Sequence, residues 1–248
     1  MQIRALTVAA ASAAVLVIAL TTHGSNKPNV QAVVDVSWPN CTAAPASMFV
    51  TGIIGVNGGL AFRPNPCLAR ETGWFNSYAL YINTGYPGAA RARKFINSPR
   101  RCGFYDSRCL AYNYGFNTAK YAINYANLSN AHASQWWLDV ETDNSWSDST
   151  AINRQSIAGT LAGIKQTISF ATVGVYSYPA QWDIITGKWH NGLPAWSATG
   201  SLSATVAAKA CHARSFTGGP VWLGQYTAGL DHNLVCSPQF TQHLASLP

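Results

Sequence analysis

Short apolar runs with strand character alternate with helical patterns along most of the chain. Strands are expected at residues 32–37, 49–56, 78–84, 136–141, 171–178, 193–198 and 221–226. Helices are expected within residues 67–77 and over residues 116–128, 149–169, 181–186 and 202–211. This order favours an α/β fold with a mainly parallel sheet, and we predict an irregular (β/α) barrel of the TIM type.

The run at residues 135–142 reads Gln-Trp-Trp-Leu-Asp-Val-Glu-Thr and predicts a buried strand. Because side chains alternate along a strand, Trp137, Asp139 and Glu141 share one face, and the residues between them take the other. Two carboxyl groups at the end of an apolar strand should raise the pKa of at least one of them. A general acid beside an anionic partner requires this arrangement. The alternative is a pair of surface carboxylates where the strand ends.

Polar residues also end the other expected strands. They are Asp35 and Ser37, Asn83 and Thr84, and Tyr176 and Ser177. In a β/α barrel the carboxyl ends of the strands converge on one mouth, where the active site lies. The sequence therefore predicts that these polar residues meet Asp139 and Glu141.

The first residues have the pattern of an export signal. Arg4 is followed by an almost uninterrupted apolar run from Ala5 to Leu20, which is short for a membrane span. We expect residues 1–32 to be a signal peptide or N-terminal anchor with a short linker, and residues 33–248 to form one barrel domain. The protein is then secreted or held at the cell surface, and touches a membrane only through an uncleaved leader.

Six cysteines follow this leader, and an even number in an exported chain indicates three disulfides. Cys102 and Cys109 are close in sequence and are expected to pair. Cys41–Cys67 and Cys211–Cys236 would complete the set, although six cysteines allow fifteen connectivities. No Cys-x-x-Cys spacing occurs, so a zinc site is disfavoured, and we expect no metal and no cofactor.

Only 10% of residues are charged, and the formal net charge is +7, or +5 without Arg4 and Lys27. Many of the cations fall between Arg91 and Arg108, in a segment (89–114) expected to be a long, solvated loop held by Cys102–Cys109. Excess positive charge favours anionic polymers. An exported nuclease is one such alternative. The chain has no metal-binding carboxylate or histidine motif for it, so no nucleic-acid partner is expected.

Five motifs occur in order along residues 33–248. They are Val34-Asp35-Val36-Ser37, Leu138-Asp139-Val140-Glu141, Val173-Gly174-Val175-Tyr176, Pro194-Ala195-Trp196-Ser197-Ala198, and Gln225-Tyr226 followed by Asp231 and Asn233. This set resembles the glycoside hydrolase family 25 lysozymes, muramidases that cut the glycan strands of peptidoglycan. The resemblance implies an irregular β/α barrel and an N-acetylated glycan as substrate, and we expect a monomer.

The resemblance also implies roles for individual residues. Glu141 matches the general acid, Asp139 the partner carboxylate, and Asp35 and Asp231 the acids that position water or substrate. The residues expected to bind substrate are Tyr176, Trp196, Gln225, Tyr226 and Asn233. Trp137, Trp182 and Trp222 are further candidates for stacking on sugars, although for each of them a position in the core is the better reading.

The sequence departs from the family pattern at three places. The second strand ends in Gly55-Val56-Asn57-Gly58-Gly59, the basic segment 89–114 is an insert, and the interval before Asp231 is short. The low content of acidic residues and the altered second strand motivate a second reading: a barrel without turnover that binds cell-wall glycan or acts as a surface-interaction protein.

Overall fold

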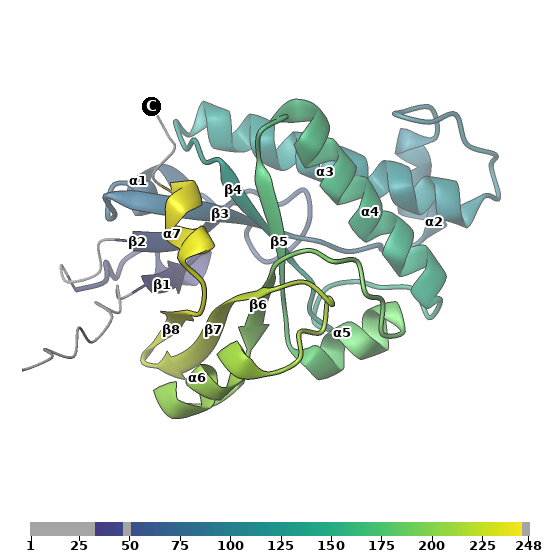
Figure 1. Ribbon diagram of the computed structural model, residues 1–248. Coiled ribbons are helices and arrows are strands. Elements are labelled where there is room, and N and C mark those ends of the chain that lie inside the picture. Colours follow the sequence, from purple (N-terminus) through teal and green to yellow (C-terminus); the bar gives the residue numbers. More distant parts are fainter. Residues whose placement is uncertain (1–32, 47–50, 245–248) are drawn as a thin grey trace, which may run out of the picture.

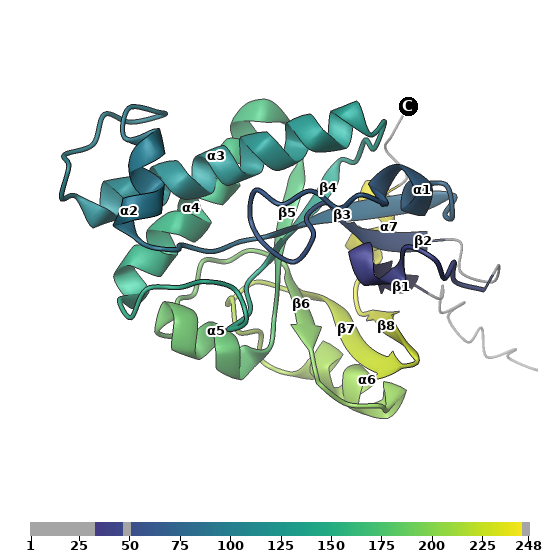
Figure 2. The same cartoon turned by 180° about the vertical axis from the view of Figure 1, so that it is seen from behind.

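The computed structural model describes residues 33–46 and 51–244, and within them eight strands form a closed barrel (Figures 1 and 2). The strands are β1 (Val33–Val36), β2 (Thr51–Gly55), β3 (Ser77–Asn83), β4 (Gln135–Asp139), β5 (Thr172–Ser177), β6 (Ala195–Ala198), β7 (Val221–Ala228) and β8 (Leu230–Val235). The predicted barrel is confirmed. The predicted leader, residues 1–32, lies outside the described residues.

β8 was not expected, and it closes the barrel. Strands β1 to β7 pair in parallel with their sequence neighbours, whereas β8 runs antiparallel to both β7 and β1. Gly229, at φ 82°, forms the tight turn between β7 and β8. The Asp-His-Asn sequence inside β8 lacks the residues typical of a strand, because polar side chains in it face the barrel mouth. Asp231 therefore lies on a strand.

Helices cover the outside of the barrel. They are α1 (Leu68–Thr72), α2 (Ala89–Ala92), α3 (Ser107–Leu128), α4 (Thr150–Thr167), α5 (Pro179–Thr186), α6 (Ala204–His212) and α7 (Pro238–Leu244), with 3-10 turns η1 (Trp38–Asn40) and η2 (Arg93–Phe95). The expectation of one long loop over residues 89–114 was wrong. That segment holds α2, η2 and the start of α3, whose N-terminus is capped by the Asp106 carboxylate accepting from the Cys109 backbone at 3.0 Å.

Helices α3 and α4 lie side by side along one flank of the barrel (Figures 1 and 2). The backbones touch because glycines face the partner helix. A Cβ at Gly115 would overlap the Ser156 carbonyl oxygen, and one at Gly159 would overlap that of Tyr112. On α4, Ile157 and Ile164 are buried, Leu161 and Ile168 pack against the same core, and small residues fill the centre of the contact with α3. On α3, Leu128 is exposed.

The strand alternation predicted for residues 136–141 is confirmed by the core. Trp137 packs inside the barrel with Ile53 and Leu223, whereas Trp136 and Leu138 pack outward against the helices. Phe240 and Leu244 of α7 join the inner cluster. They contact residues near the strand starts, so α7 closes the end of the barrel away from the site described below.

The three predicted disulfides are present: Cys41–Cys67, Cys102–Cys109 and Cys211–Cys236. They join a loop to α1, the basic segment to α3, and α6 to the end of β8. Among the helices of the described residues, none has the length and apolar character needed to span a bilayer.

Candidate active site

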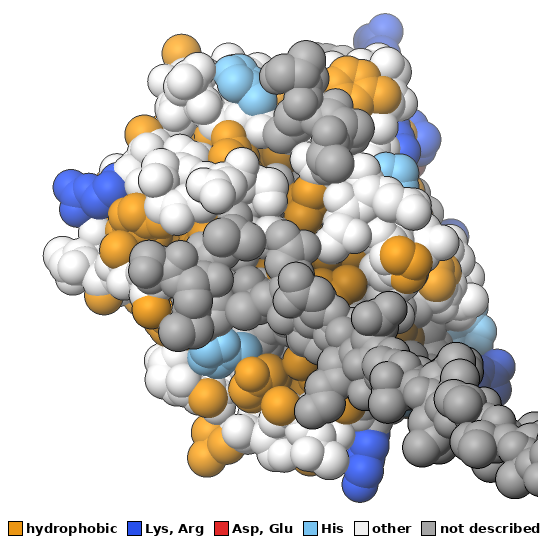
Figure 3. Space-filling model, turned by 60° about the vertical axis from the view of Figure 1, so that its left-hand side comes forward, with side chains coloured by type: hydrophobic (Ala, Val, Ile, Leu, Met, Phe, Trp, Pro, Cys, Tyr) orange, Lys and Arg blue, Asp and Glu red, His pale blue; other side chains and the backbone are white. Residues whose placement is uncertain are grey.

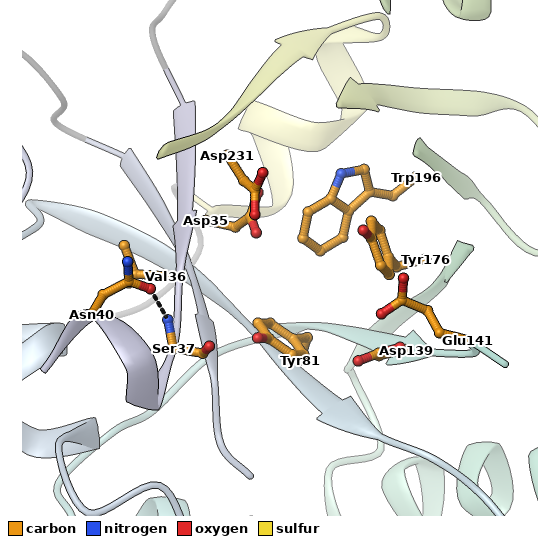
Figure 4. A pocket seen from close by; sticks show the side chains of 10 residues that line it. All are labelled: Asp35, Val36, Ser37, Asn40, Tyr81, Asp139, Glu141, Tyr176, Trp196 and Asp231. Carbon is orange, nitrogen blue, oxygen red and sulfur yellow. Dashed lines mark hydrogen bonds between the residues drawn. The ribbon is translucent and has the colours of Figure 1, made fainter. Parts of the chain in front are cut away.

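A pocket of about 130 Å³ opens at the carboxyl ends of the strands (Figure 4). All four acids singled out in the sequence line it, namely Asp35, Asp139, Glu141 and Asp231. Asp35 and Asp231 lie on one side, and Asp139 and Glu141 lie across the pocket on the other. Residues almost 200 positions apart are brought together because β8 returns to pair with β1.

The side of the pocket formed by β1 is organised around one oxygen of Asp35. Its Oδ2 accepts hydrogen bonds from Gln225 Nε2 at 3.0 Å and from Asn233 Nδ2 at 2.8 Å. Each amide is itself held by an aromatic residue. The Tyr176 hydroxyl donates to Gln225 Oε1 at 2.8 Å, and the Trp196 indole donates to Asn233 Oδ1 at 2.7 Å. The other Asp35 oxygen remains available to the pocket.

Burial and the neighbouring Asp231 carboxylate raise the pKa of Asp35 to about 8. The two amide donors favour the charged form and oppose this shift, but they are the smaller effect. Asp35 therefore carries a proton at neutral pH and can donate a hydrogen bond into the pocket. The hydroxyl of Thr227 donates to Asp231 at 2.6 Å and holds that carboxylate.

The opposite side places Asp139 deeper than Glu141. Asp139 is the last residue of β4 and is buried, and its carboxylate accepts a hydrogen bond from the Asn83 amide on β3. Glu141 lies just beyond the strand. The Trp146 indole donates to the Glu141 carbonyl at 2.7 Å, and Gln181 accepts from the Thr142 backbone at 2.9 Å. These contacts fix the turn that directs Glu141 into the pocket.

The carboxyl groups of Asp139 and Glu141 face the same pocket and affect each other's ionisation. Burial raises the pKa of Asp139, and the Glu141 charge raises it further. Burial also raises the pKa of Glu141. Two adjacent buried carboxyl groups that cannot both ionise retain one proton between them.

Three aromatic residues complete the pocket: Tyr81, Tyr176 and Trp196. The Tyr176 and Trp196 rings lie 4.4 Å apart between centroids, and Tyr81 meets Trp196 edge-on at 6.3 Å. Burial and the Asp139 charge keep the pKa of Tyr81 well above its usual value, so its hydroxyl stays a donor. The other candidate stacking residues, Trp137, Trp182 and Trp222, are buried in cores instead.

The expected substrate-binding residues divide into two groups. Tyr176 and Trp196 line the pocket. Gln225 and Asn233 are buried behind Asp35, and Tyr226 stacks on His232 at 5.2 Å away from the lining. Sequence reasoning missed Tyr81 and the role of Asn83. The alternation of residues 79, 81 and 83 along β3 was the available signal for both.

This arrangement suits acid–base chemistry on a bound molecule. It offers a proton-sharing carboxyl pair, a second, protonated carboxyl group and neutral donors around them. Among the described residues, no group of three or more His, Cys, Asp or Glu side chains has the arrangement of a metal site.

Comparisons with known proteins agree with the barrel fold. The protein family described as Lysozyme-like protein 1 matches residues 106–207. The bacterial lysozyme of Streptomyces coelicolor is 16% identical, with a TM-score of 0.58 over 88% of this chain and 97% of its own. The glycosyl hydrolase 25 GHIP of Streptococcus pneumoniae is 17% identical, with a TM-score of 0.52 over 88% and 94%. No curated protein sequence matches the chain.

A third structure, the CTP1L endolysin, is 12% identical with a TM-score of 0.53, over 87% of this chain and 69% of its own. The fold is thus a β/α barrel similar to that of the bacterial lysozyme. More narrowly, the similar structures include a glycosyl hydrolase 25, and the central part of the chain matches the family of Lysozyme-like protein 1.

Proposed function

We propose that this protein is an exported glycosidase that cleaves the glycan strands of peptidoglycan. The observation that carries the proposal is the meeting of Asp35, Asp139, Glu141 and Asp231 around one pocket at the barrel mouth. Three disulfides fit an oxidising location outside the cell.

Glu141 is the general acid in this proposal. Hydrolysis of a glycosidic bond needs a proton for the leaving oxygen and stabilisation of an oxocarbenium-like centre. The Asp139–Glu141 pair holds one proton above the usual carboxyl range. Glu141 is the less buried member and faces the pocket, so it delivers the proton. Asp139 is left charged and stabilises the cationic centre or orients an N-acetyl group of the substrate.

The opposite side of the pocket positions the other reactants. Protonated Asp35 donates to a sugar oxygen, and Asp231, held by Thr227, orients water. Trp196 and Tyr176 supply apolar faces against which a sugar ring packs.

The test compares wild type with Glu141→Gln on purified peptidoglycan, with release of reducing ends as the readout. The variant should fold, bind the glycan and lose at least 100-fold in turnover, the lower end of what general acid catalysis contributes. Asp148→Asn, an exposed acid away from the pocket, is the matched control. Full release of reducing ends by Glu141→Gln would remove Glu141 from the mechanism. Binding without release by wild type would support the glycan-binding alternative instead.

A further inference from the structure

The net positive charge of this domain is concentrated in one segment, residues 89–112, here called the basic lobe. It comprises α2, η2, the loop closed by Cys102–Cys109 and the first turns of α3. The lobe holds six of the fourteen Lys and Arg in residues 33–248, but one of the nine Asp and Glu. The basic lobe therefore carries a formal charge of +5. The rest of residues 33–248 has eight Lys and Arg and eight Asp and Glu, and so carries no net charge.

The lobe presents its cations in an ordered way. The Arg100 guanidinium lies 3.3 Å from the Tyr112 ring centroid, and that of Arg93 lies 3.9 Å from the Phe104 ring. Stacking fixes each planar group, and Arg93 Nε also donates to the Phe104 carbonyl at 3.4 Å, so the remaining N–H groups are held ready for a carboxylate or phosphate. The single acid, Asp106, is engaged in capping α3. On a face turned away from the lobe, by contrast, Lys and Arg are scattered around the outline (Figure 3).

A side pocket of about 70 Å³ lies between the basic lobe and the end of β3. Arg91 and Tyr114 line it together with Thr84 and Ser145. The Thr84 hydroxyl donates to the Asp139 backbone carbonyl at 2.6 Å. Ser145 follows Glu141 by four residues, and its carbonyl accepts from the Tyr86 backbone at 2.6 Å. A direct hydrogen bond thus joins the wall of the side pocket to Asp139, which lines the catalytic pocket.

We propose that the basic lobe binds carboxylate groups carried by the glycan strand that occupies the catalytic pocket, with Arg91 in the side pocket as the first cation the strand meets. This inference rests on the proposed glycosidase function and specifies its substrate as an acidic glycan.

The distribution of charge favours a glycan over a nucleic acid. A nucleic acid carries a phosphate at every residue and would bring that charge to the four carboxyl groups of the catalytic pocket. A glycan with acidic branches places an uncharged ring over those carboxyl groups and its carboxylates against the lobe. A glycan with acidic branches therefore fits both the acidic catalytic pocket and the basic lobe.

The experiment uses soluble, uncross-linked peptidoglycan strands, either native or with their carboxylates converted to amides. Calorimetric titration with these strands measures binding, and reducing ends measure cleavage. Wild type should bind and cleave native strands about tenfold better than amidated strands, with the advantage lost at high salt. Arg91→Gln and Arg100→Gln/Arg101→Gln should remove that preference without changing action on amidated strands. Lys209→Gln/Arg214→Gln, which removes the same charge at α6, should keep it.

The outcomes separate this inference from the proposed function. Equal binding and cleavage of native and amidated strands would overturn the inference and leave the glycosidase intact. Charge-dependent binding without reducing ends would remove the glycosidase and support the lobe as a carboxylate-binding surface. Tighter binding of DNA than of native strands, lost equally in Arg100→Gln/Arg101→Gln, would overturn the assignment to a glycan.

Discussion

Asp35 on β1 and Asp231 on β8 are direct partners across an antiparallel ladder. Residues opposite one another in such a pair point to the same face, and like charges there destabilise the fold. The protein keeps both acids at the barrel mouth because Asp35 is protonated, with a pKa raised to about 8.

Asp35→Asn should stabilise the protein at pH 8 and change little at pH 4. The folded protein retains a proton on Asp35 that the unfolded chain loses near pH 3.8. The free energy of unfolding therefore falls between roughly pH 4 and pH 8 in the wild type. Removal of this penalty should contribute about 1–2 kcal/mol at pH 8, less than the full shift implies because the pocket admits water. Urea unfolding of both proteins across this pH range measures the difference in free energy of unfolding. If the free energies of the two proteins ran parallel with pH, the prediction would be contradicted.

Hydrolysis should continue at pH values above the ordinary carboxyl range and decline as the pH rises further. The Asp139–Glu141 pair supplies the proton, and burial raises the pKa of both members. Loss of the shared proton on raising the pH removes the acid. A pH–rate profile on soluble strands measures the alkaline limb, and Asp139→Asn should shift it. A limb at the ordinary glutamate value near 4.5 would exclude this pair as the source of the acid.

Tyr176→Phe should lower kcat about tenfold with little change in KM. The Tyr176 hydroxyl orients Gln225, whose amide holds Asp35. Loss of one net hydrogen bond is worth about 1 kcal/mol, or somewhat less than tenfold, and misplacement of Asp35 adds to it. Tyr226→Phe is the matched control, because this ring stacks on His232 outside the pocket lining. Equal effects of the two substitutions would show that the hydrogen bonds that link Tyr176 through Gln225 to Asp35 do not contribute to catalysis.

Gly159→Ala should destabilise the protein by about 2 kcal/mol or more, because the added methyl group overlaps the Tyr112 carbonyl of α3 and the helices must separate. The sign is diagnostic, since the same substitution in a free helix would stabilise it by about 1 kcal/mol. Asn124→Ala, on the exposed side of α3, is the control and should be neutral or slightly stabilising. Thermal unfolding measures both, and a stabilised Gly159→Ala would show that the backbones are not in contact.

The sequence alone was sufficient to predict the parallel strands of the barrel and the acids at its mouth. Alternation placed Trp137 and Asp139 on the inner face and Trp136 on the outer one, as the structure confirms. Such periodicity reflects local backbone geometry, which sequence spacing encodes. The Cys102–Cys109 disulfide could also be predicted, because the two cysteines lie close together in the sequence. The basic segment was misread as a loop, since its helical turns are short and rich in arginine.

Only the tertiary structure decided how these parts serve the site. Gln225 and Asn233 look like ligands for substrate in the sequence, yet both hold Asp35 from behind. The polar pattern of β8 did not reveal a strand, and its pairing with β1 is what brings Asp231 to Asp35. The proton held by Asp139 and Glu141 and the raised pKa of Asp35 likewise depend on burial. The physical reason is that burial and contacts between distant strands arise only when the barrel closes, and no spacing along the chain records them.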